Sequence, residues 1–296
     1  MARRKARLKP RAASILPIAG LLGAMASFQL GASFAERMFP LVGAPGAAAL
    51  RILGAAIMLA LVRRPWRGIR AGGPWGSLMA YGVSLGAMNT LFYLALRTLP
   101  LGIAVAIEFI GPLGVAMATS RRPSDLIWVA LAVGGLILLL PLGFGGSRID
   151  LTGALLALAA GGCWALYIVF GRRAGEAHGA NATGLGVFIA ALVFVPPQIA
   201  LQGAALFTPA AIPLALAVAL LSSALPYSLE MFALTRMPPR LFGTLMSLEP
   251  AVGAIAGAAL LGQSLAPVQW AGIAAVMAAS AGAAVTGAVP PDTPTE

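Results

Sequence analysis

Long runs of apolar residues, separated by short polar or charged stretches, fill most of the chain. A run of about 20 apolar residues can cross the hydrocarbon core of a membrane as one helix. The alternation of apolar and polar residues that a membrane β-barrel needs is absent from the sequence. Ten helical spans can be drawn, and the second and fifth are the weakest because Arg51 and closely spaced Pro and Gly interrupt them. The predicted spans are 15–35, 42–62, 75–96, 99–119, 126–142, 153–171, 183–203, 211–234, 241–261 and 268–288.

The two halves of the chain share a residue pattern at a fixed offset of 138 positions. An Ala-Leu pair followed by two prolines at the same spacing occurs in each half, and Pro112 thereby corresponds to Pro250. Each half holds five spans, an odd number, so the second half must enter the membrane upside down, as in transporters built from inverted repeats. The sequence therefore predicts an all-α polytopic membrane protein of about ten helices in two inverted five-helix repeats. Its expected parts are a basic N-terminus (1–14), a first repeat (15–142), a second repeat (153–288) and a disordered tail (289–296).

Composition supports this class. Hydrophobic residues make up 59% of the chain, charged residues only 10%, and the mean hydropathy is +0.91. Soluble domains carry about 25% charged residues, so this chain could not cover a water-exposed surface. The net charge of +11 does not indicate nucleic-acid binding, because Arg and Lys are scattered between apolar runs.

The distribution of positive charge predicts the orientation. Sixteen of the 20 Lys and Arg residues fall on one side of the predicted spans, three fall on the other, and Arg51 lies within a span. Loops rich in Lys and Arg stay in the cytoplasm, which places both termini there. Ala24-Met25-Ala26 resembles a signal-peptidase site, but the apolar run continues beyond it to Ala35, and we interpret the segment as an uncleaved first helix.

Four ionisable residues lie within the spans, namely Arg51, Glu108, Glu230 and Glu249. Such residues cost about 2.5–3.5 kcal/mol on insertion scales and are functional candidates by default. The offset places Glu249 on Gly111, three residues from Glu108 and so on the same helix face. We hypothesise that Glu108 or Glu249 meets a substrate ammonium or a proton. The alternatives are a pair with Arg51 or a hydrogen bond to backbone, and Glu230 is a candidate gate or a structural partner of nearby arginines.

Two prolines and a group of polar and aromatic residues complete the candidate site. Pro112 and Pro250 lie inside spans, where each removes a backbone hydrogen bond, so they are candidate helix breaks or simple kinks. Helical spacing puts Asn89 and Tyr93 on one face of the third span, and Trp164 and Tyr167 on one face of the sixth. Tyr227 is the repeat equivalent of Asn89. Packing or interfacial roles are the alternative, and for Trp164 and Tyr167 they explain the residues equally well. The group comprises Asn89, Tyr93, Tyr227, Trp164 and Tyr167.

Enzyme signatures fail on inspection. The G-x-S-x-G sequence at Gly82–Gly86 lies in an apolar helix without a histidine partner and is better interpreted as small-residue helix packing. The only histidine, His178, is expected in a solvated cytoplasmic loop, and the single Cys163 cannot form an intrachain disulfide. No metal-binding or phosphate-binding motif occurs, so we expect no cofactor, metal or catalytic residue.

The sequence resembles the EamA branch of the drug/metabolite transporter superfamily, and within it the bacterial inner-membrane exporters of threonine and homoserine. The resemblance covers nearly the whole chain and is carried by the strings ALRTLP (95–100), ALTRMP (233–238), FPLVGAPG (39–46), YGVSLGAMN (81–89), PLGIAVAIEF (100–109), SSALPYSLEMFALTRMP (222–238) and FGTLMSLEPA (242–251). Glu249-Pro250 matches the Glu-Pro motif of the second EamA repeat, whereas the first repeat has Gly111-Pro112. That departure leaves open whether Glu108 replaces the missing acid.

The resemblance implies secondary active export of small hydrophilic amino acids from the cytoplasm, without an enzymatic activity. Proton antiport is the economical coupling hypothesis, because one proton moving down about 100 mV supplies about 2.3 kcal/mol. The expected partners are therefore an amino acid, protons and the lipid bilayer. Export of another metabolite or of a cationic drug remains the alternative, and a membrane scaffold without transport lacks the soluble domain or long loops it would need.

Overall fold

The computed structural model describes residues 10–63, 75–118, 126–139, 150–178, 181–234, 236–237 and 239–286. The described residues form ten helical segments and no strand, which confirms the all-helical prediction. Six segments are single helices: α1 (Pro10–Glu36), α2 (Phe39–Arg63), α3 (Trp75–Ala95), α6 (Leu126–Leu139), α7 (Leu151–His178) and α13 (Pro267–Thr286). A seventh, α8 (Ala182–Gln202), ends in the short 3-10 helix η4 (Gly203–Phe207).

The remaining three segments are each divided. The first comprises α4 (Leu101–Glu108) and α5 (Ile110–Ala118), and the last comprises α11 (Pro239–Met246) and α12 (Glu249–Leu261). The middle one contains α9 (Ala211–Ala219), a π-helical turn η5 (Leu220–Ala224) and α10 (Leu225–Leu234). The predicted tail 289–296 and residues 1–9 of the predicted N-terminus lie outside the described residues, and α1 begins at Pro10, before the predicted span.

The segments have the length and the outward surface of membrane helices. In the described part of the chain, seven helices are long and apolar enough to cross a membrane. Three shorter apolar helices, at 101–115, 126–139 and 211–223, accompany them. Many large apolar side chains face outward, and Leu61 and Leu201 are 76% and 78% exposed. Water would not favour such a surface, whereas lipid would. The chain is therefore a multi-pass membrane protein.

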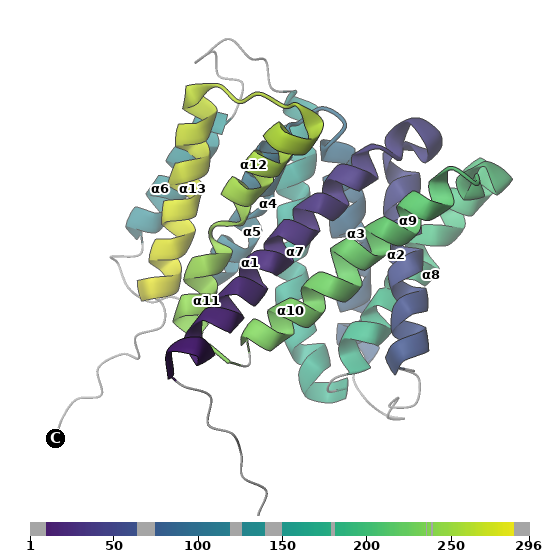
Figure 1. Ribbon diagram of the computed structural model, residues 1–296, viewed down its shortest axis with the longest axis horizontal. Helices are drawn as coiled ribbons and strands as arrows, with labels where there is room; N and C mark the ends of the chain where they lie inside the picture. The colour runs from purple at the N-terminus through teal and green to yellow at the C-terminus, as the bar shows by residue number, and fades with distance from the viewer. Residues whose placement is uncertain are drawn as a thin grey trace, which may run out of the picture.

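The helix contacts follow the offset found in the sequence. Helix α3 packs on α7 and α8, and its repeat equivalent, α9 with α10, packs on α1 and α2. The fourth helices of the two halves, α4 and α12, pack on each other, and so do the fifth, α6 and α13. In Figure 1, α6 and α13 lie together at one end of the molecule, and α2 and α8 lie at the other. Exchanging the halves thus reproduces the main helix contacts of this kind, although the repeat boundaries stay a prediction.

Small residues allow the backbones to approach closely in this packing. A Cβ atom on Gly82 of α3 would lie 2.7 Å from the carbonyl oxygen of Gly186 on α8, which supports the interpretation of this glycine as a packing residue. Helix α2 is kinked where Gly43 adopts a φ of 67°, two residues before Pro45. The kink separates a short first turn from the straight part of α2 that carries Arg51.

Candidate functional site

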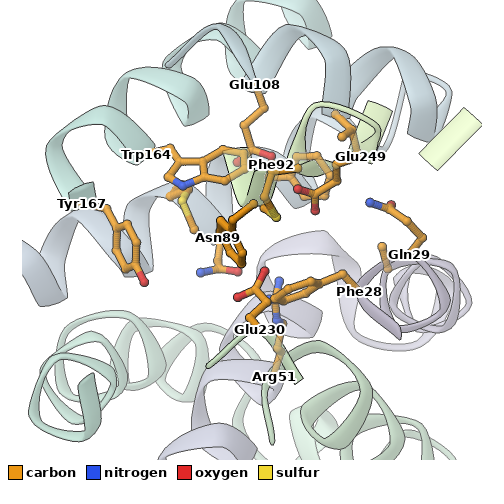
Figure 2. A pocket seen from close by; sticks show the side chains of 15 residues that line it. Phe28, Gln29, Arg51, Asn89, Phe92, Glu108, Trp164, Tyr167, Glu230 and Glu249 are labelled. Carbon is orange, nitrogen blue, oxygen red and sulfur yellow. The ribbon is translucent and has the colours of Figure 1, made fainter. Parts of the chain in front are cut away.

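A pocket of about 240 Å³ lies between the two halves, and helices from both contribute to its walls. Figure 2 shows that its lining combines charged, amide and aromatic side chains. The lining residues are Phe28, Gln29, Ala32, Arg51, Met88, Asn89, Phe92, Val105, Glu108, Trp164, Tyr167, Glu230, Phe242, Met246 and Glu249. All four ionisable residues singled out in the sequence therefore face one space, as do Asn89, Trp164 and Tyr167.

Two helix breaks place the two deepest carboxylates. Helix α4 ends at Glu108, and after Phe109 the chain continues as α5, with Pro112 in its first turn. The corresponding break between α11 and α12 is followed directly by Glu249 and Pro250. Proline is tolerated in the first turn of a helix, where its missing N–H has no intrahelical partner anyway. Each proline thus marks the start of a new helix beside a glutamate.

Glu108 and Glu249 are 7% and 8% exposed, and both line the pocket. Figure 2 shows both carboxylates on the same side of the pocket. The Oε2 atom of Glu249 is buried without a hydrogen-bond partner among the described residues. A buried carboxylate is costly when it is ionised and unpaired, so this pair needs a proton or a cationic ligand. The geometry brings together the two acids that the repeat offset associates.

Arg51 lies in the middle of α2 and is held by two contacts on one side. Its Nη2 atom donates to the carbonyl oxygen of Ser222 at 3.1 Å, and its guanidinium lies 5.6 Å from the centre of the Tyr93 ring. Within the described part of the chain, no carboxylate lies within 4.0 Å of this guanidinium. The ion pair found among the described residues is Arg172–Glu176, on the surface of α7. The alternative of a direct Glu108–Arg51 or Glu249–Arg51 ion pair is therefore not what the structure shows.

Tyr93 itself lies behind the pocket. It is completely buried, packs against Phe39 with ring centroids 6.0 Å apart, and is not a lining residue. Tyr93 and Asn89 are four residues apart on α3, but of the two only Asn89 lines the pocket. Tyr227 belongs to α10, and its side chain lies outside the described part of the structure.

The other predicted members contact their neighbours as follows. The Asn89 amide donates to the carbonyl oxygen of Leu85 at 2.7 Å. Trp164 meets Phe109 edge to face at 5.5 Å, and Tyr167 lies 4.9 Å from the ring of Tyr81. These contacts give the pocket one aromatic wall on α7, which carries both Trp164 and Tyr167.

Several lining residues were not predicted from the sequence. Gln29 is the most polar of them, is 3% exposed, and has its Oε1 atom buried without a partner among the described residues. A glutamine inside an apolar span was a usable signal, because such a group is expensive to bury in lipid. The apolar residues Phe28, Met88, Phe92, Phe242 and Met246 carried no comparable signal.

The structure corrects the expectation for His178. This residue ends α7, is only 5% exposed, and its ring lies 5.9 Å from that of Trp75 at the start of α3. The tight α3–α7 contact extends to the last turn of α7 and covers the imidazole. His178 is therefore a packed residue and not a solvated one.

One glutamine joins the two halves at the end of the molecule away from the start of α1. The Oε1 atom of Gln263, after α12, accepts a hydrogen bond of 2.8 Å from the backbone N–H of Leu101, the first residue of α4. The same side chain lies near the carboxylate of Glu36, the last residue of α1. Below this contact α4 crosses α12, and a Cβ on Gly253 would lie 3.3 Å from Val105. The contact thus joins the two halves beside α4 and α12, which carry the lining residues Val105 and Glu249.

In the part of the chain that the structure describes, ten apolar helical segments surround a small charged pocket, as in a polytopic membrane transport protein. The chain belongs to the EamA-like transporter family, whose pattern matches residues 151–285. It is 57% identical over 272 residues to the threonine/homoserine exporter RhtA of Escherichia coli K12, which covers 92% of each chain. The RhtA of Salmonella typhimurium LT2 is 56% identical with the same coverage.

More distant comparisons agree with this assignment. The uncharacterized transporter YwfM of Bacillus subtilis 168 is 28% identical over 69% of this chain and 71% of its own. A crystal structure with 19% identity superimposes with a TM-score of 0.54 over 93% of this chain and 98% of the other, which shows a shared fold alone. These findings confirm the resemblance found in the sequence and the assignment to a class of transporters and not of enzymes.

Proposed function

We propose that this protein exports threonine, homoserine or a closely similar small amino acid from the cytoplasm. The observation that carries the proposal is the identity of 56–57% over 92% of the chain to proteins named threonine/homoserine exporters. By the same reasoning we place the chain in a bacterial inner membrane. Both termini would lie in the cytoplasm, because sixteen Lys and Arg residues fall on that side and three on the other.

The size of the pocket favours an amino acid over a drug. Sites for drug-sized ligands enclose about 300–1,000 Å³, whereas this pocket encloses about 240 Å³. Its polar groups, Arg51, Asn89, Glu108, Glu230 and Glu249, are numerous for so small a space. A compact molecule with several charged or hydrogen-bonding groups fits such a lining better than a bulky apolar cation.

Export against a gradient requires coupling to another gradient, and Glu108 and Glu249 are the proposed proton carriers. Both are buried in the pocket, and each can exchange a proton for the ammonium group of a substrate. A proton moving down a potential of about 100 mV supplies about 2.3 kcal/mol, which corresponds to a gradient of about 50-fold. Rocking of one half against the other around this pocket would expose it to each side in turn.

A transport assay in liposomes tests the proposal. The purified chain should release labelled threonine or homoserine from loaded vesicles. Acidification of the medium outside the vesicles should accelerate this release. Vesicles without protein are the control for leakage, and a hydrophilic organic cation that does not cross the bilayer unaided is the competing substrate. Efflux of the cation without amino-acid efflux would contradict the proposed substrate, whereas amino-acid efflux that ignores the pH gradient would leave an uncoupled facilitator.

A further inference from the structure

We propose that Arg51 binds the carboxylate group of the transported amino acid, so that the substrate lies across the pocket with its ammonium group toward Glu108 and Glu249. This inference rests on the proposed function, because it requires a zwitterionic substrate. The proposed function itself would stand without it, since the carboxylate could be bound elsewhere.

The first argument is that Arg51 carries a positive charge that no carboxylate in the described part of the chain pairs at ion-pair distance. Arginine stays ionised under all ordinary conditions and offers five N–H donors in a planar fork. The backbone carbonyl of Ser222 accepts from Nη2, and no carboxylate of the described residues lies within 4.0 Å. A membrane interior makes an unpaired cation costly. A pocket-lining arginine in this state is a site for an anionic group.

The second argument is that the guanidinium is held in one orientation. Ser222 belongs to the π-helical turn η5, in which two successive carbonyl groups accept from side chains of other helices. Ser27 of α1 donates to Leu221 O at 2.6 Å, and Arg51 of α2 donates to Ser222 O. The Tyr93 ring lies under the guanidinium at 5.6 Å. Arginine fixed in this way is pre-organised for the two parallel hydrogen bonds that a carboxylate accepts.

The third argument is the distribution of charge across the pocket. Figure 2 shows Glu108 and Glu249 on one side of the space and Arg51 on the opposite side, with Asn89 and Phe92 between them. Glu230 lies on the side of Arg51 in this view, but not within ion-pair distance. An amino acid carries its opposite charges on one carbon atom and its side chain on the same atom. The pocket therefore offers a partner of the correct sign to each end of the zwitterion.

Binding measurements with matched ligands test this assignment. Homoserine has a free carboxylate, whereas its lactone keeps the ammonium group and lacks the carboxylate charge. Ligand-induced shifts of the melting temperature of the purified full chain give both dissociation constants. The unchanged protein should bind homoserine at least tenfold more tightly than the lactone, and Arg51→Gln should remove this preference. Arg37→Gln removes the same charge from an exposed residue outside the pocket and should change neither constant.

The outcomes separate this inference from the proposed function. An Arg51→Gln protein that keeps the tenfold preference would overturn the role of Arg51 while leaving amino-acid export intact. An unchanged protein that binds neither homoserine nor threonine would contradict the proposed function itself. If Arg51→Gln fails to fold, Arg51→Lys keeps the charge without the planar fork, and it should bind homoserine several-fold more weakly with lactone binding unchanged. Equal weakening for both ligands would mean that Arg51 only supports the fold.

Discussion

The Cα atom of Gly111 lies directly against the carbonyl group of Gly161, and a side chain at position 111 would overlap that oxygen. In return, a Cβ on Gly161 would lie 2.6 Å from the carbonyl oxygen of Glu108. The break between α4 and α5 is thus pressed against the middle of α7 by two facing glycines. Position 111 is the repeat equivalent of Glu249. The first half therefore has no space for a glutamate there, and its acid lies three residues earlier, at Glu108.

This contact predicts that restoring the missing glutamate damages the protein. We expect Gly111→Ala to destabilise the fold by about 1–3 kcal/mol, as overpacking typically does, and Gly111→Glu to prevent folding. Gly114→Ala on the same helix is the matched control, because a Cβ there would meet nothing within 4 Å. Melting temperature and monodispersity of the purified proteins measure the effect. A Gly111→Glu protein as stable as the control would contradict the close approach.

A second prediction separates substrate exchange from proton coupling. Glutamine has the shape of glutamate but cannot carry a proton. Substituting glutamine for whichever of Glu108 and Glu249 carries the coupled proton should therefore leave threonine exchange measurable. The acceleration of net efflux by a pH gradient should fall at least tenfold in that variant. Glu176→Gln is the matched control, because Glu176 is 67% exposed on α7 and pairs with Arg172. Full pH-driven transport by both pocket variants would exclude these glutamates as carriers.

A third prediction concerns the start of α7, outside the membrane span. Asp150 accepts hydrogen bonds from the backbone N–H groups of Gly153 at 3.0 Å and Thr152 at 3.3 Å. These bonds, that of Gly153 foremost, together with the Thr98 hydroxyl, hold the pKa of Asp150 below its ordinary value. A lowered pKa in the folded state stabilises the fold above the unfolded-state pKa of about 3.9. This contribution is lost as the pH falls through the folded-state pKa.

Asp150→Ala should therefore lower the melting temperature at pH 7, and the difference from the unchanged protein should shrink at about pH 3, below the ordinary aspartate pKa. Asp150→Asn keeps a capping oxygen without the charge and should lose less at pH 7. Melting curves at the two pH values measure both effects. A difference that does not change with pH would show that the cap acts without its charge.

The sequence was sufficient for the features that depend on composition and spacing. Glu108, Glu249 and Arg51 were found because an ionisable residue inside an apolar run is rare, and the pairing of the halves followed from the offset of 138 residues. Both depend on the chain alone. The structure adds that one pocket is lined by Arg51, Asn89 and the three glutamates together.

Features set by helix rotation and local packing could not be predicted in this way. Asn89 and Tyr93 share one face of α3, yet only Asn89 lines the pocket. Tyr93 does not, because Arg51 of α2 lies over its ring. The π-helical turn at Ser222 has no signature in its small and apolar residues. The burial of His178 depends on how far α3 and α7 remain in contact, which a single sequence does not state.

The last prediction concerns the Gln263 contact, which joins the two halves at one end of the molecule. Gln263 accepts a hydrogen bond from the Leu101 N–H at 2.8 Å and lies near Glu36, so one side chain of the second half contacts two helices of the first. In the proposed orientation this end faces the outside. Opening the pocket outward must break this contact, and removing it in advance should favour the open state. The lost hydrogen bond leaves a helix-start N–H unpaired, at a cost of about 1–3 kcal/mol to the closed state.

Gln263→Leu should therefore raise the accessibility of the pocket from outside. In a Cys163→Ser background, a cysteine in place of Val105 reports on the pocket wall, because Val105 is a lining residue on α4. A membrane-impermeant thiol reagent added outside should label this cysteine roughly tenfold faster in Gln263→Leu, which corresponds to about 1.4 kcal/mol. Gln202→Leu is the matched control, because Gln202 lies at the same end on α8 and, among the described residues, hydrogen-bonds within its own helix, to Gln198. Equal labelling rates in both variants would mean that Gln263 stabilises the fold without holding the outer end closed.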